Sequence, residues 1–360
     1  MSIKPVVFAV TIAVFAFPAV GAEQTPSYPK ISGSVAFELE NNANYNSDDA
    51  TNEFNSLSTK IEPAIGIRFT PQFSVNTTLT FEPVQDPAFP GEDRFFDNQG
   101  LILSVLTANY DTDRFSLYGG KFGPYFGTAW DISPGLFGAD LAKGYELGKS
   151  IGLGGSVTTQ KTRFGTHALS VDTFFLDSTR LSETAFTRAV RTRERDGGPG
   201  NTGDLGSVLV GLNGQNLGGL KGLNYHLSYL SLGNETAAAS DESRIGVGAN
   251  YQLNLTDKWG LFGLVEYVNI DNADGTNDQD RYYLTGAAQV SYDAWNIALS
   301  YTDKETEPSG GTTTNEAQFK VSAGYVFGFG LGLDLGWTTV RNDGIDTDTF
   351  GTKLSYTIEF

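Results

Sequence analysis

Two residues of the chain have the types and the spacing needed for nucleophilic chemistry. His226 and Ser228 lie two positions apart, so on a β-strand both side chains would point to the same face. An imidazole beside a hydroxyl can activate that hydroxyl for attack on an ester, which makes lipid hydrolysis one function to consider. The only other histidine is His167 and the chain has no cysteine, so a metal site built from several His or Cys ligands is excluded.

Charged side chains supply a second kind of chemistry, the selection of ions and polar solutes in a water-filled pore. One group lies in segment 123–146, and a second group alternates with apolar residues elsewhere. Their signs are mixed, but the chain carries a net charge of −18, which favours cations. The candidate pore residues are Asp131, Asp140, Lys143 and Glu146 in the segment, and Lys60, Glu62, Arg68, Glu82 and Lys121 outside it.

The elements that must position these residues are β-strands, because apolar and polar residues alternate along the whole chain. In 31–40 the odd positions are mostly apolar, whereas the even positions include Ser32, Glu38 and Glu40. Successive strand residues point to opposite faces, so this period of two predicts strands with one apolar face. We expect the polar face to carry Ser, Thr, Asn, Gly and charged residues, with few bulky apolar ones. About 16 strands follow: 31–40, 56–69, 73–84, 100–110, 114–122, 147–159, 166–176, 206–213, 222–232, 244–255, 260–269, 281–292, 295–304, 315–327, 330–341 and 347–360.

The connections between these strands alternate in length. Short turns rich in Pro, Asp, Asn and Gly join every second pair, and longer polar segments join the others. If both termini lie at one end, all turns fall at that end and all loops at the other, as in membrane barrels with short periplasmic turns and long extracellular loops. The expected loops are 41–55, 85–99, 123–146, 177–205, 233–243, 270–280, 305–314 and 342–346.

A soluble β-sandwich also alternates, but three features favour a membrane barrel. The strands are longer than the ~5–6 residues usual in soluble sheets, the connections alternate in length, and aromatic residues gather near strand ends, where they form interfacial girdles. The fold class expected is therefore all-β, a transmembrane antiparallel β-barrel. Aromatic residues expected at the turn end are Phe69, Phe73, Tyr110, Phe115, Trp259, Tyr292, Trp295, Phe327 and Phe360, and those at the loop end are Tyr229, Tyr267, Tyr301 and Trp337.

The N-terminus has the features of a cleaved secretory signal. A lysine in 1–4 precedes an apolar stretch, and Val20-Gly21-Ala22 ends that stretch with small residues. We expect residues 1–22 to be removed and 23–360 to form a single barrel domain. The acidic balance argues against nucleic-acid binding, which needs clustered Lys and Arg. No motif calls for a cofactor, and none is expected.

Two segments resemble Gram-negative outer-membrane porins. The last strand, Phe350-Gly351-Thr352-Lys353-Leu354-Ser355-Tyr356-Thr357-Ile358-Glu359-Phe360, is similar to the terminal strand of that family, which alternates and ends in Phe. The stretch 120–131, GKFGPYFGTAWD, resembles the passage from strand to third loop in porins. The resemblance implies a bacterial outer-membrane location, a homotrimer, recognition of Phe360 by the barrel-assembly machinery, and a third loop, here 123–146, that folds into the barrel.

The function expected is a channel for passive diffusion of ions and small hydrophilic solutes, and not an enzyme. A barrel of 16 to 18 strands encloses an aqueous lumen, and segment 123–146 would form its narrowest part. The expected partners are outer-membrane lipid, lipopolysaccharide and the diffusing solutes. Two alternatives remain open, a plugged structural or adhesive barrel and an outer-membrane phospholipase. The second needs a lipid-facing His–Ser pair, whereas the alternation turns His226 and Ser228 to the lumen.

Overall fold

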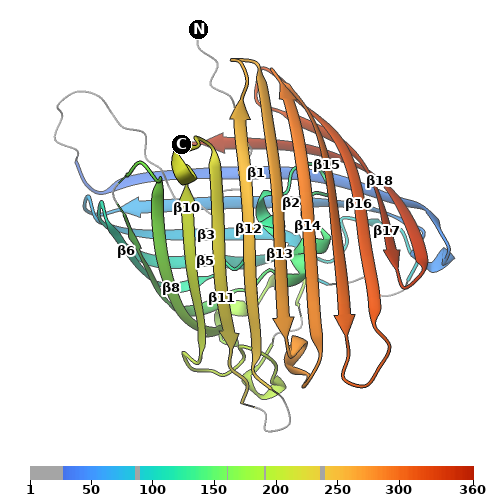
Figure 1. The fold of residues 1–360 in the computed structure, drawn as a ribbon, viewed down its shortest axis with the longest axis horizontal. Helices are drawn as coiled ribbons and strands as arrows, with labels where there is room; N and C mark the ends of the chain where they lie inside the picture. Colours follow the sequence, from blue (N-terminus) through green and yellow to red (C-terminus); the bar gives the residue numbers. More distant parts are fainter. Residues whose placement is uncertain (1–26, 86–89, 160, 190–191, 236–239) are drawn as a thin grey trace.

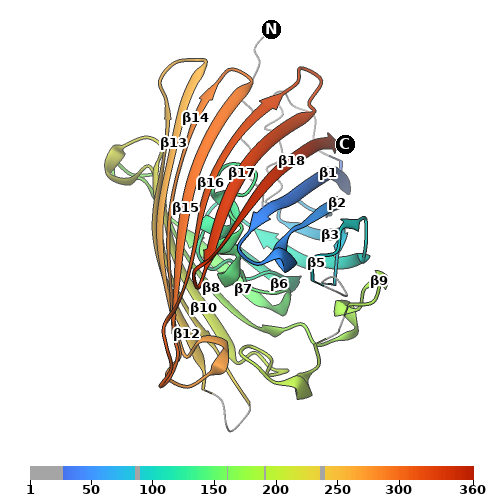
Figure 2. The same ribbon diagram turned by 90° about the vertical axis from the view of Figure 1, so that its right-hand side faces the viewer.

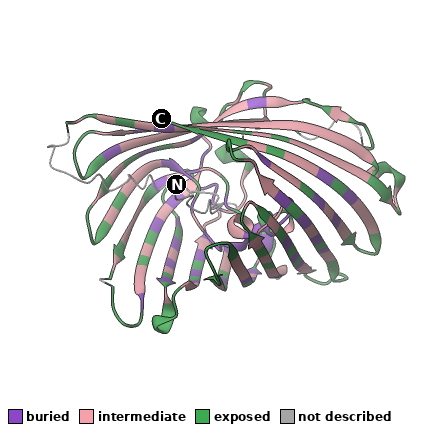
Figure 3. Cartoon of the chain, turned by 90° about the horizontal axis from the view of Figure 1, so that it is seen from above, coloured by how far each residue is buried: buried purple, intermediate pink, exposed green. Residues whose placement is uncertain are grey.

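The computed structural model describes residues 27–85, 90–159, 161–189, 192–235 and 240–360. The expected signal peptide, 1–22, lies outside the described residues. Within them, the chain forms a closed antiparallel β-barrel, drawn from the side in Figures 1 and 2 and from above in Figure 3. No helix in this part of the chain is long and apolar enough to cross a membrane.

Sixteen strands make the ring, and each pairs with its neighbour in sequence order until β18 pairs with β1 and closes it. Two short strands, β4 (Arg94–Phe95) and β9 (Ala185–Phe186), pair with the ring but are not part of it. All sixteen expected strands are confirmed, with ends shifted by three residues or fewer except in β1, which runs seven residues beyond its expected end. The ring consists of β1 (Lys30–Ser47), β2 (Phe54–Arg68), β3 (Phe73–Pro83), β5 (Gln99–Asp111), β6 (Phe115–Phe122), β7 (Ser150–Thr158), β8 (Thr166–Leu176), β10 (Ser207–Gln215), β11 (Leu223–Leu232), β12 (Glu242–Asn254), β13 (Trp259–Asp271), β14 (Asp280–Tyr292), β15 (Trp295–Glu307), β16 (Thr314–Val326), β17 (Gly332–Asn342) and β18 (Ile345–Glu359).

The alternation that predicts the strands also sorts their side chains between membrane and lumen. In β15, Ile297 and Leu299 are exposed on the outer surface, whereas Ala298 and Ser300 are buried inside. A closed barrel leaves no strand edge without a hydrogen-bond partner, so an apolar outer surface can meet lipid. Exposed aromatic residues form pairs at the turn end, as the girdle prediction requires: Phe69 with Phe73, Tyr110 with Phe115, and Trp259 with Tyr292.

The connections separate by length as expected, and between β12 and β17 the short turns lie at the top of Figure 1. Two of the expected long loops are wrong. Most of 41–55 is strand, because β1 and β2 stay paired from Lys30 and Arg68 as far as Asn44 and Phe54. The expected loop 342–346 is a two-residue turn, in which Asp343 (φ 48°) and Gly344 (φ 88°) both adopt the left-handed conformation that tight hairpins need.

The outer surface should not tolerate charge. Val265, at the middle of β13, is 54 % exposed on the outer side. We expect Val265→Arg to lower the free energy of unfolding by about 2–4 kcal/mol, the cost of a cation at the bilayer midplane. Reversible urea unfolding in lipid vesicles measures this. Ser58→Arg is the control, because Ser58 is paired with Glu40 on the lumen face, and an equal loss in both variants would contradict the assignment of the faces.

Candidate functional site in the barrel lumen

The chain between β6 and β7 leaves the barrel wall and runs inside the barrel. This segment, 123–149, is called the lumen loop below. It begins with Gly123-Pro124, and Pro124 lacks the amide N–H that a continuing strand would need. It then forms α1 (Ala129–Ile132) and the short helix η2 (Leu141–Tyr145). Both helices appear in green within the barrel in Figure 1, and they contact β13 and β15 on the opposite wall.

Glu266 of β13 holds both ends of the lumen loop. Its carboxylate accepts hydrogen bonds from Thr128 N at 2.6 Å, Thr128 Oγ1 at 2.8 Å and Ala129 N at 2.9 Å. The hydroxyl of Tyr145, at the end of η2, also donates to it. Glu266 is 1 % exposed. A buried carboxylate needs several donors to offset the loss of hydration, and the lumen loop supplies four of them.

The two candidate hydrolytic residues belong to this anchor. His226 and Ser228 face the lumen, as expected, while Leu227 and Tyr229 are exposed on the outer surface. His226 Nε2 lies 2.8 Å from Glu266 Oε2, and His226 Nδ1 lies 3.2 Å from Thr128 Oγ1. His226 and Ser228 are buried at 4 % and 9 % exposure, so neither residue is accessible to a lipid substrate.

Two cations anchor backbone carbonyls of the lumen loop. The Lys320 ammonium of β16, 3 % exposed, donates to Gly138 O at 3.0 Å. Arg244 of β12 donates to Tyr145 O at 2.8 Å and is paired with Glu242 at 2.6 Å. Carboxylate to amide and ammonium to carbonyl are charge-assisted hydrogen bonds, which are stronger than neutral ones. The lumen loop is therefore tied to β12, β13 and β16.

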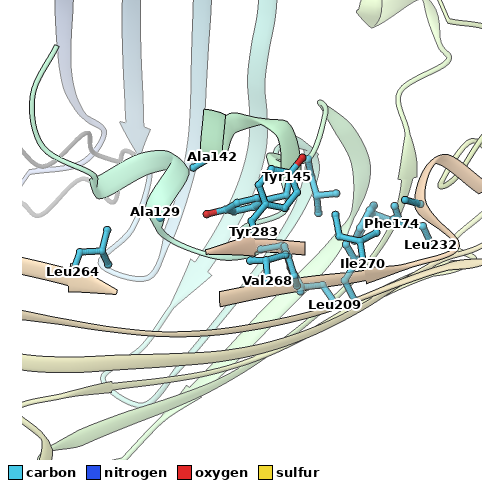
Figure 4. Packing of buried hydrophobic residues seen from close by; sticks show 14 residues of the cluster. Ala129, Ala142, Tyr145, Phe174, Leu209, Leu232, Leu264, Val268, Ile270 and Tyr283 are labelled. Atoms are coloured by element: carbon cyan, nitrogen blue, oxygen red, sulfur yellow. The ribbon is translucent and has the colours of Figure 1, made fainter. Parts of the chain in front are cut away.

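Apolar packing supports these polar contacts. Phe126 and Tyr145 of the lumen loop are fully buried against the inner face of the wall, and the Tyr145 ring meets Tyr283 edge-on at 5.1 Å. Figure 4 shows the Tyr145 and Tyr283 side chains between the short helices and the strands. On the inner face of β13, Glu266 is surrounded by apolar residues, with Leu264, Val268 and Ile270 all buried. The expectation of few bulky apolar residues on the inner face is therefore wrong where the lumen loop packs.

A glycine pair makes room for the middle of the lumen loop. Gly336 of β17 and Gly351 of β18 are paired across the strands. A Cβ on Gly351 would lie 2.3 Å from the Phe137 ring, and one on Gly336 would lie 3.1 Å from it. Only glycine leaves room for the ring this close to the wall. Through these contacts the lumen loop lies against strands from β11 to β18. None of the contacts described above joins it to the wall of β1–β3, which is called the uncovered wall below.

Four of the candidate residues lie on the lumen loop itself. Asp140, Lys143 and Glu146 are exposed, and the Asp140 and Lys143 side chains retain 42 % and 56 % of their accessible surface. Asp131 is half-buried and accepts a hydrogen bond from the Tyr125 hydroxyl at 3.0 Å. Burial raises the pKa of Asp131 to about 6, the Tyr125 hydrogen bond opposes the rise, and the negative charge of Glu146 adds to it.

Three further candidates lie on the uncovered wall. Lys60 and Glu62 of β2 form a half-exposed ion pair at 3.3 Å, and Glu82 of β3 is within electrostatic range of Lys60. Four charged residues outside the sequence-predicted set lie near them, two on β1 and one each on the adjoining strands β17 and β18. Glu40 interacts electrostatically with both Asp140 and Lys143, so this wall faces the lumen loop. The alternation in 31–40 was the available signal for Glu40. The added residues are Glu38, Glu40, Asp334 and Lys353.

Two candidates do not belong to this group. Lys121 is 2 % exposed, and its ammonium is paired with Asp177 at 2.6 Å and donates to Leu181 O at 2.7 Å. It lies opposite Leu106, whose side chain is on the outer surface, so Lys121 faces outward beneath the segment after β8. Arg68 is at the turn end of β2, where it donates to Pro71 O at 3.2 Å. Lys121 as a pore-lining residue is therefore wrong, and Arg68 lies away from the lumen loop.

Comparisons with known structures agree on the architecture. OprB of Pseudomonas putida is similar with a TM-score of 0.63 and 10 % identity, covering 91 % of this chain and 94 % of that one. OccK1 (OpdK) of Pseudomonas aeruginosa has a TM-score of 0.55 at 10 % identity, covering 92 % and 99 %. The outer membrane channel DcaP of Acinetobacter baumannii has 0.55 at 10 %, covering 91 % and 96 %. The chain has the outer-membrane porin fold. No protein-family model and no curated protein matches the sequence.

Removing the central anchor should release the lumen loop. Glu266→Ala leaves four buried donors without their acceptor, so we expect a loss of about 3–5 kcal/mol in unfolding free energy. Trypsin cleavage after Lys143 should become faster. Glu266→Gln keeps an acceptor oxygen and should lose less. The control is Glu62→Ala, on the solvated wall. Unchanged cleavage after Lys143 in folded Glu266→Ala would show that Glu266 does not fix the loop.

Proposed function

We propose that the protein is an outer-membrane channel for passive diffusion of small hydrophilic solutes and ions, with the lumen loop as its constriction. One observation carries this proposal: the lumen loop is fixed to the wall of β11–β18, yet its charged edge stays solvated and faces β1–β3. A 16-stranded barrel is wide enough for an aqueous lumen. A segment that fills one side of the lumen narrows this channel without closing it.

The charges facing each other across the proposed passage set its ion preference. They are called the passage charges, and they comprise six carboxylates and three lysines. Fixed charges at the narrowest section act on every ion that passes, whereas the net charge of the chain does not. The excess of carboxylates favours cations. The passage charges are Glu38, Glu40, Glu62, Glu82, Asp140 and Asp334 against Lys60, Lys143 and Lys353.

Single-channel recording in planar bilayers tests the proposal. Folded protein should give stable open steps proportional to salt concentration, with a reversal potential of cation-selective sign in a salt gradient. The double variant Glu40→Gln/Glu62→Gln should lower the cation-to-anion permeability ratio about twofold per charge removed, since a unit charge ~8 Å away in water contributes ~0.5 kcal/mol. The matched control is Glu92→Gln/Glu235→Gln, which neutralises two exposed loop carboxylates. Absence of conductance in a folded barrel would refute the channel.

Asp131 should make the selectivity depend on pH. Its pKa near 6 is above the ordinary value of 3.8, so it carries a proton below about pH 6. Lowering the pH from 7.5 to 5 should remove one negative charge from the lumen and reduce the cation preference, with a midpoint near 6. The same raised pKa stabilises the folded loop at low pH, and this contribution is lost as pH rises through about 6. In Asp131→Asn the step should be absent, and its persistence would assign it to another group.

The remaining expectations belong to this proposal. Burial of His226 and Ser228 beneath the lumen loop supports a channel over a phospholipase, and the solvated edge at Asp140 and Lys143 supports an open lumen over a plugged barrel. The chain is further proposed to form a homotrimer, for which conductance steps in threes are the test. Phe360 exchanges backbone hydrogen bonds with Gly33 at 2.8 and 2.9 Å, so the residue proposed for recognition by the assembly machinery also completes the ring.

A further inference from the structure

A cavity of about 240 Å³ lies at the loop end of the barrel, beside the end of the lumen loop. Its walls come from the end of the lumen loop, from the loop-end residues of β7, β8, β11 and β12, from the segment after β8 and from the turn after β13. Phe174, Leu147 and Leu232 form an apolar floor, and all three are buried. Figure 4 shows Phe174 and Leu232 next to each other. The volume is below the ~300–1,000 Å³ of sites for drug-sized ligands, so it suits a solute with a single ring.

The rim of this cavity is acidic. Its charged residues are Glu146, Glu242 and Asp274 against the single cation Arg244. Arg244 is already engaged by Glu242 and by Tyr145 O. Asp274 is paired with Arg281 at 2.6 Å and remains 65 % exposed. Among the described residues Glu146 has no ion pair, and its carboxylate is exposed. A cation entering the cavity would meet uncompensated negative charge above an apolar floor.

A buried hydroxyl beside the floor lacks a partner. Ser207 is paired across the strands with Phe174, so both side chains are on the lumen face. Ser207 is fully buried, and its Oγ has no hydrogen-bond partner among the described residues. Gly200, which lines the cavity, has no side chain, and a Cβ there would lie 3.7 Å from that oxygen. Ser207 is not one of the cavity-lining residues, so a solute in the cavity would contact the apolar floor and the charged rim and not this hydroxyl.

We propose that this cavity is an entry site for small aromatic ammonium solutes on their way to the lumen loop. The ring lies on the apolar floor and the ammonium group at Glu146, the one carboxylate of the lining that has no ion pair among the described residues. The inference rests on the proposed channel and names the class of solute that it concentrates. The proposed solutes are cationic, whereas OpdK has been crystallised with vanillate, an aromatic carboxylate.

Three compounds that share one ring test the charge directly: vanillylammonium, neutral vanillyl alcohol and vanillate. Titration calorimetry on the folded full-length protein in detergent should show affinity that decreases in that order. Glu146→Gln should weaken vanillylammonium about fivefold, the effect of one charge at ~4 Å in water, and leave vanillyl alcohol unchanged. Glu146→Lys should reverse the order in favour of vanillate. Glu92→Gln, an exposed loop carboxylate away from the cavity lining, should bind like the parent protein.

The outcomes separate the two proposals. Equal affinity for the three compounds, or no effect of Glu146→Gln, overturns the cation site, whatever the bilayer recordings show. Loss of affinity in Glu92→Gln equal to that in Glu146→Gln would reduce the effect to overall charge and also overturn it. Conductance is recorded on the same preparation. A folded barrel that shows no conductance but still binds vanillylammonium through Glu146 would refute the channel and support the binding site.

Discussion

The lumen of this barrel depends on one buried carboxylate. Glu266 is on a membrane-spanning strand and is sealed from water, so its charge is tolerable only with several donors around it. The four donors come from the lumen loop, and His226 of the wall lies 2.8 Å from the carboxylate. The loop is equally dependent, because Thr128 N and Ala129 N at the start of α1 have no other acceptor among the described residues. Neither part is satisfied without the other, and this fixes the position of the loop across the lumen.

The position of the loop makes the lumen asymmetric. On the β11–β18 side, polar groups are paired and buried, and apolar side chains exclude water. On the β1–β3 side, carboxylates and lysines remain partly exposed, and even the Lys60–Glu62 ion pair is half-exposed. Buried pairs fix structure, whereas solvated charges stay available to ions. The two halves of the inner surface therefore have different roles, although the same alternation of residues creates both.

Alternation is strong enough to predict every strand of the ring. A shift of one residue in strand register would turn the whole apolar face of a strand into the water-filled lumen. It fails where a second surface covers the wall. Leu264, Val268 and Ile270 make the inner face of β13 apolar around Glu266, and a strand apolar on both faces was the available signal of a packed segment. The Asp343-Gly344 pair is likewise a known signature of a two-residue hairpin. No local pattern identifies Glu266 as the anchor, since its donors come from residues more than 100 positions earlier in the chain.

Lys121 links the path of the lumen loop to the position of the segment after β8. Once the chain leaves the wall after Phe122, β5 loses its neighbour beyond Leu106, the residue paired with Lys121. The segment after β8 occupies this place, with β9 paired to β5 at Gly100 and Leu101. Lys121, the penultimate residue of β6, is sealed beneath this segment by its ion pair with Asp177, and both side chains are 1 % exposed. A buried pair of this kind contributes little net stability but strongly penalises loss of either partner. It therefore specifies where the covering segment attaches, and a lumen loop that leaves the wall requires such a cover to keep the barrel closed.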